Sequence, residues 1–298
     1  MRWFRVAAAL WCATAAAAQT LPVLLSRLSE EAEVFRQAAP QMLAEENFTQ
    51  RALVAKVRFN PRIGAAATNP AAPFWQTREI VSEYSFGMLH EAPGSLHEFR
   101  EVTSVDGRTV NSPEKARHSL VLGLTSPDDS VKKRMLEEFQ KYGLSTAVVD
   151  FGQLILLFTR RQMGNYRFEP AGDDRIGADQ VRVIAYEQLS GPGRMLVFQG
   201  RRAVHQPIRG RIYSRLPDGL PLRITISETR RNGKHDFRDD ATVEYTQTAH
   251  GFLAPVAISH RGFAGNDLLV EDQFRYTAFR KFGADTEIKF DVSPGAVK

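Results

Sequence analysis

Apolar residues recur at helical spacing near the start of the chain. Leu24, Leu28, Ala32 and Phe35 follow one another at intervals of four, four and three positions, with charged residues between them. This spacing matches the period of about 3.6 residues of an amphipathic helix. Pro40 is expected to end or kink the helix, because proline lacks an amide hydrogen.

Two further helices are predicted in the middle of the chain. The first begins at Ser126-Pro127-Asp128-Asp129, which combines an N-cap, a proline in the first turn and acidic residues, and it ends at Gly143. The second is expected to start near Ser145 and to end before the Arg160-Arg161 pair. Its apolar stripe consists of Val148, Phe151, Ile155 and Phe158.

Strict alternation of apolar and polar positions predicts strands over most of the remaining chain. Before the mid-chain helices, the predicted strands are 51–59, 79–86 and 97–104. After the helices, turn sequences rich in Gly, Asp and Asn separate strands at 181–183, 211–215, 222–227, 242–246, 252–259, 270–277 and 287–292. Hairpin turns at such short spacing favour an antiparallel meander over parallel units joined by helices.

The predicted fold is α+β, with a large curved antiparallel sheet in the form of a half-barrel. So many strands exceed what a flat open sheet holds, so the sheet should curl. The N-terminal helix and the two mid-chain helices are expected to cover its concave face. Since no internal linker is visible, residues 19–298 are predicted to form a single domain.

The first eighteen residues have the pattern of a cleavable signal peptide. A cationic head with Arg2 and Arg5 precedes a short apolar run, and Ala16-Ala17-Ala18 supplies small residues before a cut at Gln19. The apolar run is shorter than the ~20 residues of a membrane-spanning helix. We therefore expect a periplasmic or secreted protein with no transmembrane segment after cleavage. Cleavage also removes Cys12, the only cysteine of the chain.

Composition, charge and motifs argue against several classes of function. The chain of 298 residues is 43% hydrophobic and 24% charged, which is typical of a globular protein. Its arginine pairs are scattered, whereas a nucleic-acid interface gathers basic residues in one patch, so no nucleic-acid partner is expected. His235-Asp236 with Asp239 and Asp240 is interpreted as a solvated loop, and no metal site or cofactor is predicted. No serine-hydrolase motif occurs, and no catalytic residue is assigned.

The order of the elements resembles the lipoprotein-carrier superfamily, the LolA/LolB-like half-barrels of the bacterial envelope. The resemblance also rests on residues 210–224, GRIYSRLPDGLPLRI, which look like the family's strand, turn and strand, and on 251–256, GFLAPV, followed by Phe274-Arg275-Tyr276. It implies a helix-covered concave face that holds acyl chains. We therefore expect this chain to belong to a group of envelope proteins that share the fold.

Five apolar residues are the candidate lining of such a site: Phe139, Tyr142, Phe151, Ile155 and Phe158. They form either a packed core between helices and sheet or the wall of a groove for an apolar ligand. Phe158, close to Arg160-Arg161, is expected to lie nearer the rim than Phe151.

Three functions are consistent with the sequence. The first is an exported, non-enzymatic protein that binds lipid, lipoprotein or another apolar ligand. The alternative is an envelope protein–protein module with a filled core, which acts through its edge strands or the 60–73 loop. An exported hydrolase is the third and least favoured.

Overall fold

The computed structural model describes residues 20–54, 72–145, 150–189, 204–205, 208–232 and 235–281. The predicted signal peptide, the predicted strand 287–292 and most of the 60–73 loop lie outside these residues.

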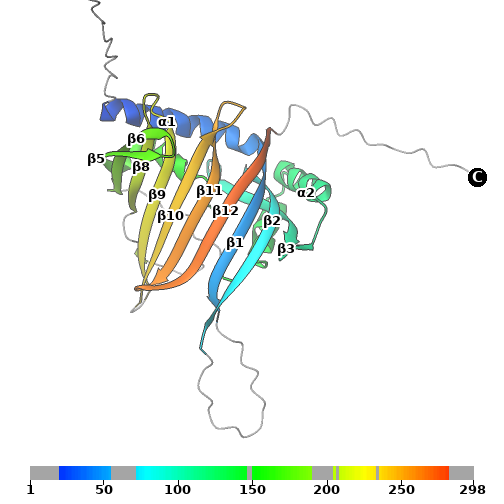
Figure 1. The fold of residues 1–298 in the computed structure, drawn as a ribbon. Coiled ribbons are helices and arrows are strands. Elements are labelled where there is room, and N and C mark those ends of the chain that lie inside the picture. Colours follow the sequence, from blue (N-terminus) through cyan, green and yellow to red (C-terminus); the bar gives the residue numbers. More distant parts are fainter. Residues whose placement is uncertain are drawn as a thin grey trace, which may run out of the picture.

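A single antiparallel sheet dominates the fold (Figure 1). Its strands run in the order β4-β3-β2-β1-β12-β11-β10-β9-β8-β6-β5, and β7 pairs with β9 beside this path. The first and last strands of the path do not pair, so the sheet is curved but open. The strands are β1 (Met42–Val54), β2 (Phe74–Met88), β3 (Leu96–Val105), β4 (Arg108–Thr109), β5 (Tyr166–Ile176), β6 (Asp179–Gln188), β7 (Val204–His205), β8 (Arg209–Arg215), β9 (Pro221–Asn232), β10 (His235–Gln247), β11 (Leu253–Ala264) and β12 (Asp267–Lys281).

The helices of the described chain are three α-helices and three short 3-10 helices. The α-helices are α1 (Leu21–Ala38), α2 (Pro113–Thr125) and α3 (Asp129–Gln140), and the 3-10 helices are η1 (Ala39–Gln41), η2 (Leu154–Phe158) and η3 (Met163–Asn165). Together with the open antiparallel sheet, they confirm the predicted α+β fold class. The predicted strand at 51–59 corresponds to β1, which begins earlier than expected, at Met42.

The two faces of the sheet differ in chemistry. Phe48 of β1 lies opposite Phe274 of β12, which in turn lies opposite Ile258 of β11, and all three are buried. We call this side the core face. Because side chains alternate along a strand, their neighbours, such as Asn47 and Arg275, lie on the other side, which we call the outer face.

α1 covers the core face. Leu24, Leu28, Ala32 and Phe35 are at most 1% exposed, as their helical spacing predicts, and they belong to the main hydrophobic cluster. The helix crosses the ends of the strands and contacts η2 and β11 (Figure 1). The predicted helix end is also confirmed, because the α-helix stops at Ala38 just before Pro40.

The prediction of an α-helix from Ser145 to Phe158 is wrong. The described part of that stretch forms only the 3-10 helix η2, and Val148 lies outside the described residues. Its apolar stripe is nevertheless buried. The backbone bonds within this stretch are of the 3-10 type, such as Leu154 N to Phe151 O at 3.0 Å, and two amides and one carbonyl bond to side chains of the sheet, as detailed below.

The helix that precedes α3 in the chain, α2, was not predicted from the sequence. It begins with the same signal as the predicted helix, a capping serine followed by proline: the Ser112 hydroxyl accepts a hydrogen bond from Lys115 N at 3.3 Å. α2 packs on the outer face of β2 and β3. There its Leu120 joins a separate buried cluster with Leu43, Leu89, Phe99 and Met135.

Truncation of Leu120 tests this second cluster. Leu120 is fully buried, so Leu120→Ala should lower the free energy of unfolding by about 2–5 kcal/mol through lost burial and a residual cavity. Leu122 lies on the same helix and is 56% exposed. Leu122→Ala is the matched control and should change stability by less than about 0.5 kcal/mol. Equal effects of the two substitutions in urea denaturation would contradict the packing of α2.

Candidate functional site

All five predicted lining residues lie in or against the main hydrophobic cluster on the core face. Phe139, Phe151, Ile155 and Phe158 are between 0 and 4% exposed, and Tyr142 is partly buried. The expectation that Phe158 lies nearer the rim is wrong: its ring packs among Tyr166, Phe168 and Tyr186, with the Tyr186 centroid 4.9 Å away. Aromatic side chains of β5 and β6 enclose it, which the spacing to Arg160 did not show.

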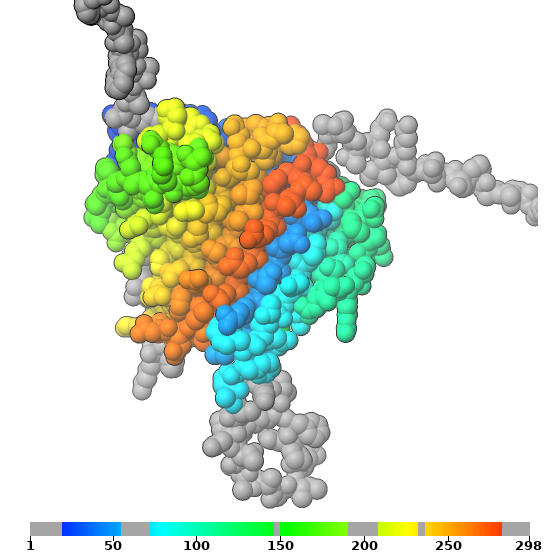
Figure 2. All heavy atoms as spheres, in the orientation of Figure 1, coloured from blue at the N-terminus to red at the C-terminus, as the bar shows by residue number. Residues whose placement is uncertain are grey.

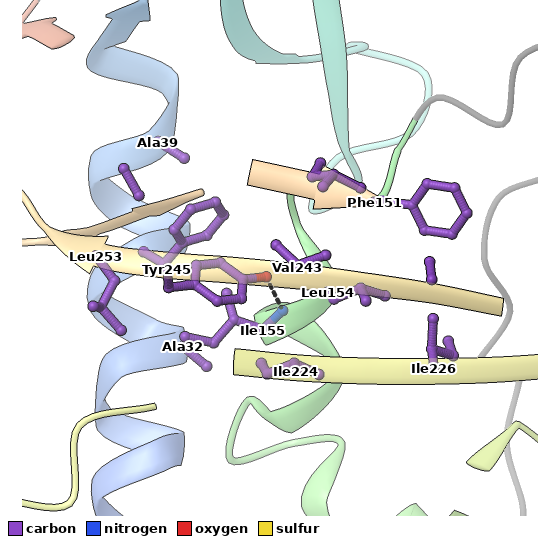
Figure 3. Close-up of a cluster of buried hydrophobic side chains, with 14 of the residues drawn as sticks. Ala32, Ala39, Phe151, Leu154, Ile155, Ile224, Ile226, Val243, Tyr245 and Leu253 are labelled. Carbon is purple, nitrogen blue, oxygen red and sulfur yellow. Dashed lines mark hydrogen bonds between the residues drawn. The ribbon is translucent and has the colours of Figure 1, made fainter. Parts of the chain in front are cut away.

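Residues 150–158, which we call the inserted segment, carry three of the five. This segment packs beside α1, and both lie on the core face of the strands (Figure 3). Leu154 and Ile155 point toward strands β9 and β10, where Ile224 and Val243 are fully buried. The segment therefore fills the middle of the core face with its own apolar side chains.

Tyr245 of β10 fixes the inserted segment by its hydroxyl. The hydroxyl accepts a hydrogen bond from Ile155 N at 3.1 Å and donates one to Gly152 O at 3.2 Å. The ring belongs to the main cluster, so the phenol joins the polar backbone of the segment to the apolar face of the sheet (Figure 3).

A buried charge cluster holds the start of the segment. The Arg100 guanidinium lies between two carboxylates: its Nε donates to Glu46 at 2.8 and 2.9 Å, and its Nη2 donates to Glu98 Oε2 at 2.7 Å. Glu98 Oε1 accepts the Gly152 amide at 2.6 Å. A Cβ at Gly152 would lie 2.9 Å from both Glu98 Oε1 and the Tyr84 hydroxyl, so the close approach requires glycine.

Burial and the charge of Arg100 act in opposite directions on the pKa of Glu98. Burial outweighs the charge of Arg100 and raises the pKa of Glu98 to about 8. The hydrogen bonds that both oxygens accept act in the same direction as Arg100 and lower the pKa, but burial outweighs them. Phe139, one of the predicted residues, packs on this cluster, with the Arg100 guanidinium 4.8 Å from its ring centroid.

A second charged cluster lies beneath Phe151. Its ring is 5.0 Å from that of His260, which is 1% exposed. His260 Nδ1 lies 2.8 Å from Asp272 and Nε2 lies 3.1 Å from Asp239. Gln50 connects this cluster to the chain after α3, because its Nε2 donates to Asp272 at 2.9 Å while its Oε1 accepts the Leu144 and Ser145 amides.

The protonation of His260 follows from its two partners. Burial by itself lowers the pKa of His260, but the hydrogen bonds and charges of Asp239 and Asp272 outweigh burial and raise the pKa to about 9. Both ring nitrogens then donate to carboxylates, as in an imidazolium. A histidine held in this way has no free lone pair with which to act as a general base.

The interpretation of the stretch from His235 to Asp240 as a solvated loop is wrong, because it belongs to strand β10. Asp236 pairs with Arg231, Asp239 points to His260 on the core face, and Asp240 bonds to Ser227 on the outer face. Alternation along β10 thus separates these carboxylates. In the described part of the chain, no three His, Cys, Asp or Glu side chains converge as metal ligands would.

The charged residues of the core face were not among the predicted site residues. Their signal was present: Glu46 lies between Ala44 and Phe48 at alternate positions of β1, and Asp272 lies in phase with Phe274. A charge in phase with apolar neighbours on a strand indicates a buried, paired group.

Among the described helices, none combines the length and hydropathy that a membrane crossing requires.

The solved structures that are similar to this chain include two that cover most of it. A LolA superfamily protein from Nitrosomonas europaea matches 90% of this chain and 95% of that one, with 12% sequence identity and a TM-score of 0.30. A DUF1329 family protein from Desulfovibrio piger matches 89% and 94%, with 10% identity and a TM-score of 0.33. The first belongs to the superfamily that the sequence resembles. No family model and no curated protein matches the sequence.

The proton held by His260 predicts how stability depends on pH. The folded protein keeps this proton up to about pH 9, whereas an unfolded histidine releases it near 6.5. The free energy of unfolding should therefore fall as pH rises from 6.5 to 9, by on the order of 3 kcal/mol. Urea denaturation across this range measures the slope. Glu98 contributes with the same sign, so a flatter slope in His260→Gln isolates the histidine. Stability that is constant or rises over this window would contradict the assignment.

Proposed function

We propose that this protein is an exported, non-enzymatic binding protein for an apolar ligand, with the acyl chain of a lipid or lipoprotein as the ligand class. The binding place is the core face, in the space that the inserted segment fills. The observation that supports this most directly is that the central apolar filling is carried by a separate segment, which side-chain hydrogen bonds hold to the sheet.

The inserted segment and an acyl chain meet the same chemical requirements. Leu154 and Ile155 present methyl groups to Ile224, Val243 and neighbouring apolar side chains. If the segment moved away, those strand residues would remain as a continuous apolar lining. An acyl chain gains about 0.8 kcal/mol for each CH2 that it buries there, so roughly ten methylenes would gain ~8 kcal/mol.

The attachment of the segment favours local opening. The described part contains the five-residue 3-10 helix η2, whose hydrogen-bond geometry is weaker than that of an α-helix. Its backbone is tied to the sheet through Glu98 and Tyr245 rather than by strand pairing. Breaking these bonds leaves all strands of the described sheet paired. Opening therefore costs only a part of the total stability.

Export is the second component of the proposal. Residues 1–18 support it by their cationic head, short apolar run and Ala16-Ala17-Ala18. N-terminal sequencing of the protein from its host should give Gln19 as the first residue. A diacylated Cys12 at the N-terminus would instead make it a membrane-anchored lipoprotein.

Substitution of Tyr245 by phenylalanine tests the opening of the inserted segment. It removes both hydroxyl bonds to the segment and keeps the apolar ring. Because each such bond contributes about 1 kcal/mol to closure, the open form should become more populated. The apparent Kd for a fluorescent fatty acid should then fall about tenfold relative to the wild type.

Tyr166→Phe is the matched control, because the Tyr166 ring packs against Phe158 and no described residue bonds to its hydroxyl. Its fatty-acid affinity should remain that of the wild type. Native mass spectrometry of the gently purified wild type should show bound lipid. A wild type that binds neither lipid nor the fluorescent probe would overturn the proposal, as would an unchanged Kd in Tyr245→Phe.

A further inference from the structure

An open groove of about 650 Å³ lies on the outer face, away from the inserted segment. Residues of β5, β6, β8, β9 and β10 line it. Figure 2 shows this face, with β5 and β6 in green at the upper left beside the yellow strands. A volume of this size is in the range of small-molecule sites.

The strand register places one row of polar residues across the floor of the groove. From β5 to β10, the residues opposite one another are Arg167, Glu187, Arg209, Ser227 and Asp240. Arg167 binds the Glu187 carboxylate at 2.5 Å and also pairs with Glu169 at 3.5 Å. Both acids on this side of the groove thus already have a cation.

A second row lies directly beside the first. It consists of Glu169, Ala185, Arg211, Thr225 and Thr242. The neighbours of Arg211 across the strands are Ala185 and Thr225, so no carboxylate stands next to it in its row. The small side chain of Ala185 leaves room over the strand.

Arg209 and Arg211 therefore form a pair of unmatched cations at the centre of the groove. They are two positions apart on β8, so both point to the outer face, about 7 Å from each other along the strand. Both are exposed, and within the described residues neither guanidinium has an ion-pair partner. On the far side, Asp240 is occupied by Arg238 Nε at 3.0 Å and by the Ser227 hydroxyl at 2.7 Å.

We propose that this groove is a binding site for a phosphate-type anion, held by Arg209 and Arg211. Guanidinium groups present N–H donors in a planar fork that matches phosphate oxygens in a bidentate manner. The Thr225 hydroxyl accepts the Arg211 amide at 2.9 Å, which leaves its hydrogen to donate to the ligand. The site lies on the face opposite the apolar core, and it does not depend on the proposed lipid function.

Calorimetric titration of the full mature protein with glycerol phosphate at low and at physiological salt tests this site. We expect saturable binding that persists at physiological salt. Arg209→Ala and Arg211→Ala each remove the charge-assisted hydrogen bonds of one guanidinium to the phosphate, so each should weaken binding by about tenfold or more. Both side chains are exposed, so the variants should fold.

Arg275→Ala is the matched control. Arg275 is an exposed arginine on the same outer face, on β12 outside the groove, and its loss should leave the affinity unchanged. A parallel sedimentation assay with phosphatidylglycerol vesicles, against phosphatidylcholine vesicles, distinguishes the source of the phosphate. Binding of the soluble ester indicates a small phosphorylated ligand, and binding of phosphatidylglycerol alone indicates a lipid headgroup. The site is refuted if neither probe binds, or if the three arginine substitutions weaken binding equally.

Discussion

The buried guanidinium of Arg100 is the constraint on which this architecture depends. A charge that is 1% exposed costs several kcal/mol unless carboxylates compensate it. Glu46 and Glu98 meet that need only if β1 and β3 keep their register on either side of β2. Glu98 in turn uses its second oxygen to bind Gly152. One buried cation thus sets both the alignment of three strands and the position of the inserted segment.

In this arrangement, different groups align the strands and fill the apolar interior, whereas in a simple hydrophobic core the same side chains do both. The strands are joined by backbone pairing and by charge clusters around Arg100 and His260, whereas the apolar side chains that cover the core face come from α1 and from the inserted segment. Removing the inserted segment would leave the strand pairs intact. The proposed function is that this core exchanges the inserted segment for an apolar ligand.

The sequence predicted the features that depend on local periodicity. The stripe from Leu24 to Phe35 gave α1, and alternation gave the strand meander, because burial of one face acts through residues close in sequence. The sequence did not predict features that depend on contacts between residues far apart in the chain. Nothing local at Ser145 shows that Glu98 and Tyr245 will bind the following backbone. The two arginines of the groove are likewise meaningful only once register sets Arg209 and Arg211 among Ala185, Ser227 and Thr225.

Amide hydrogen exchange of the native protein tests the central claim, that the inserted segment opens without unfolding of the sheet. The Gly152 and Ile155 amides donate to side chains, whereas those of β9 and β10 donate within strand pairs. The account predicts that peptides covering 150–158 exchange through local opening, faster than β9 and β10, and that a bound fatty acid changes their rate while leaving the strands unaffected. Exchange of 150–158 at the same rate as these strands, by global unfolding alone, would contradict it.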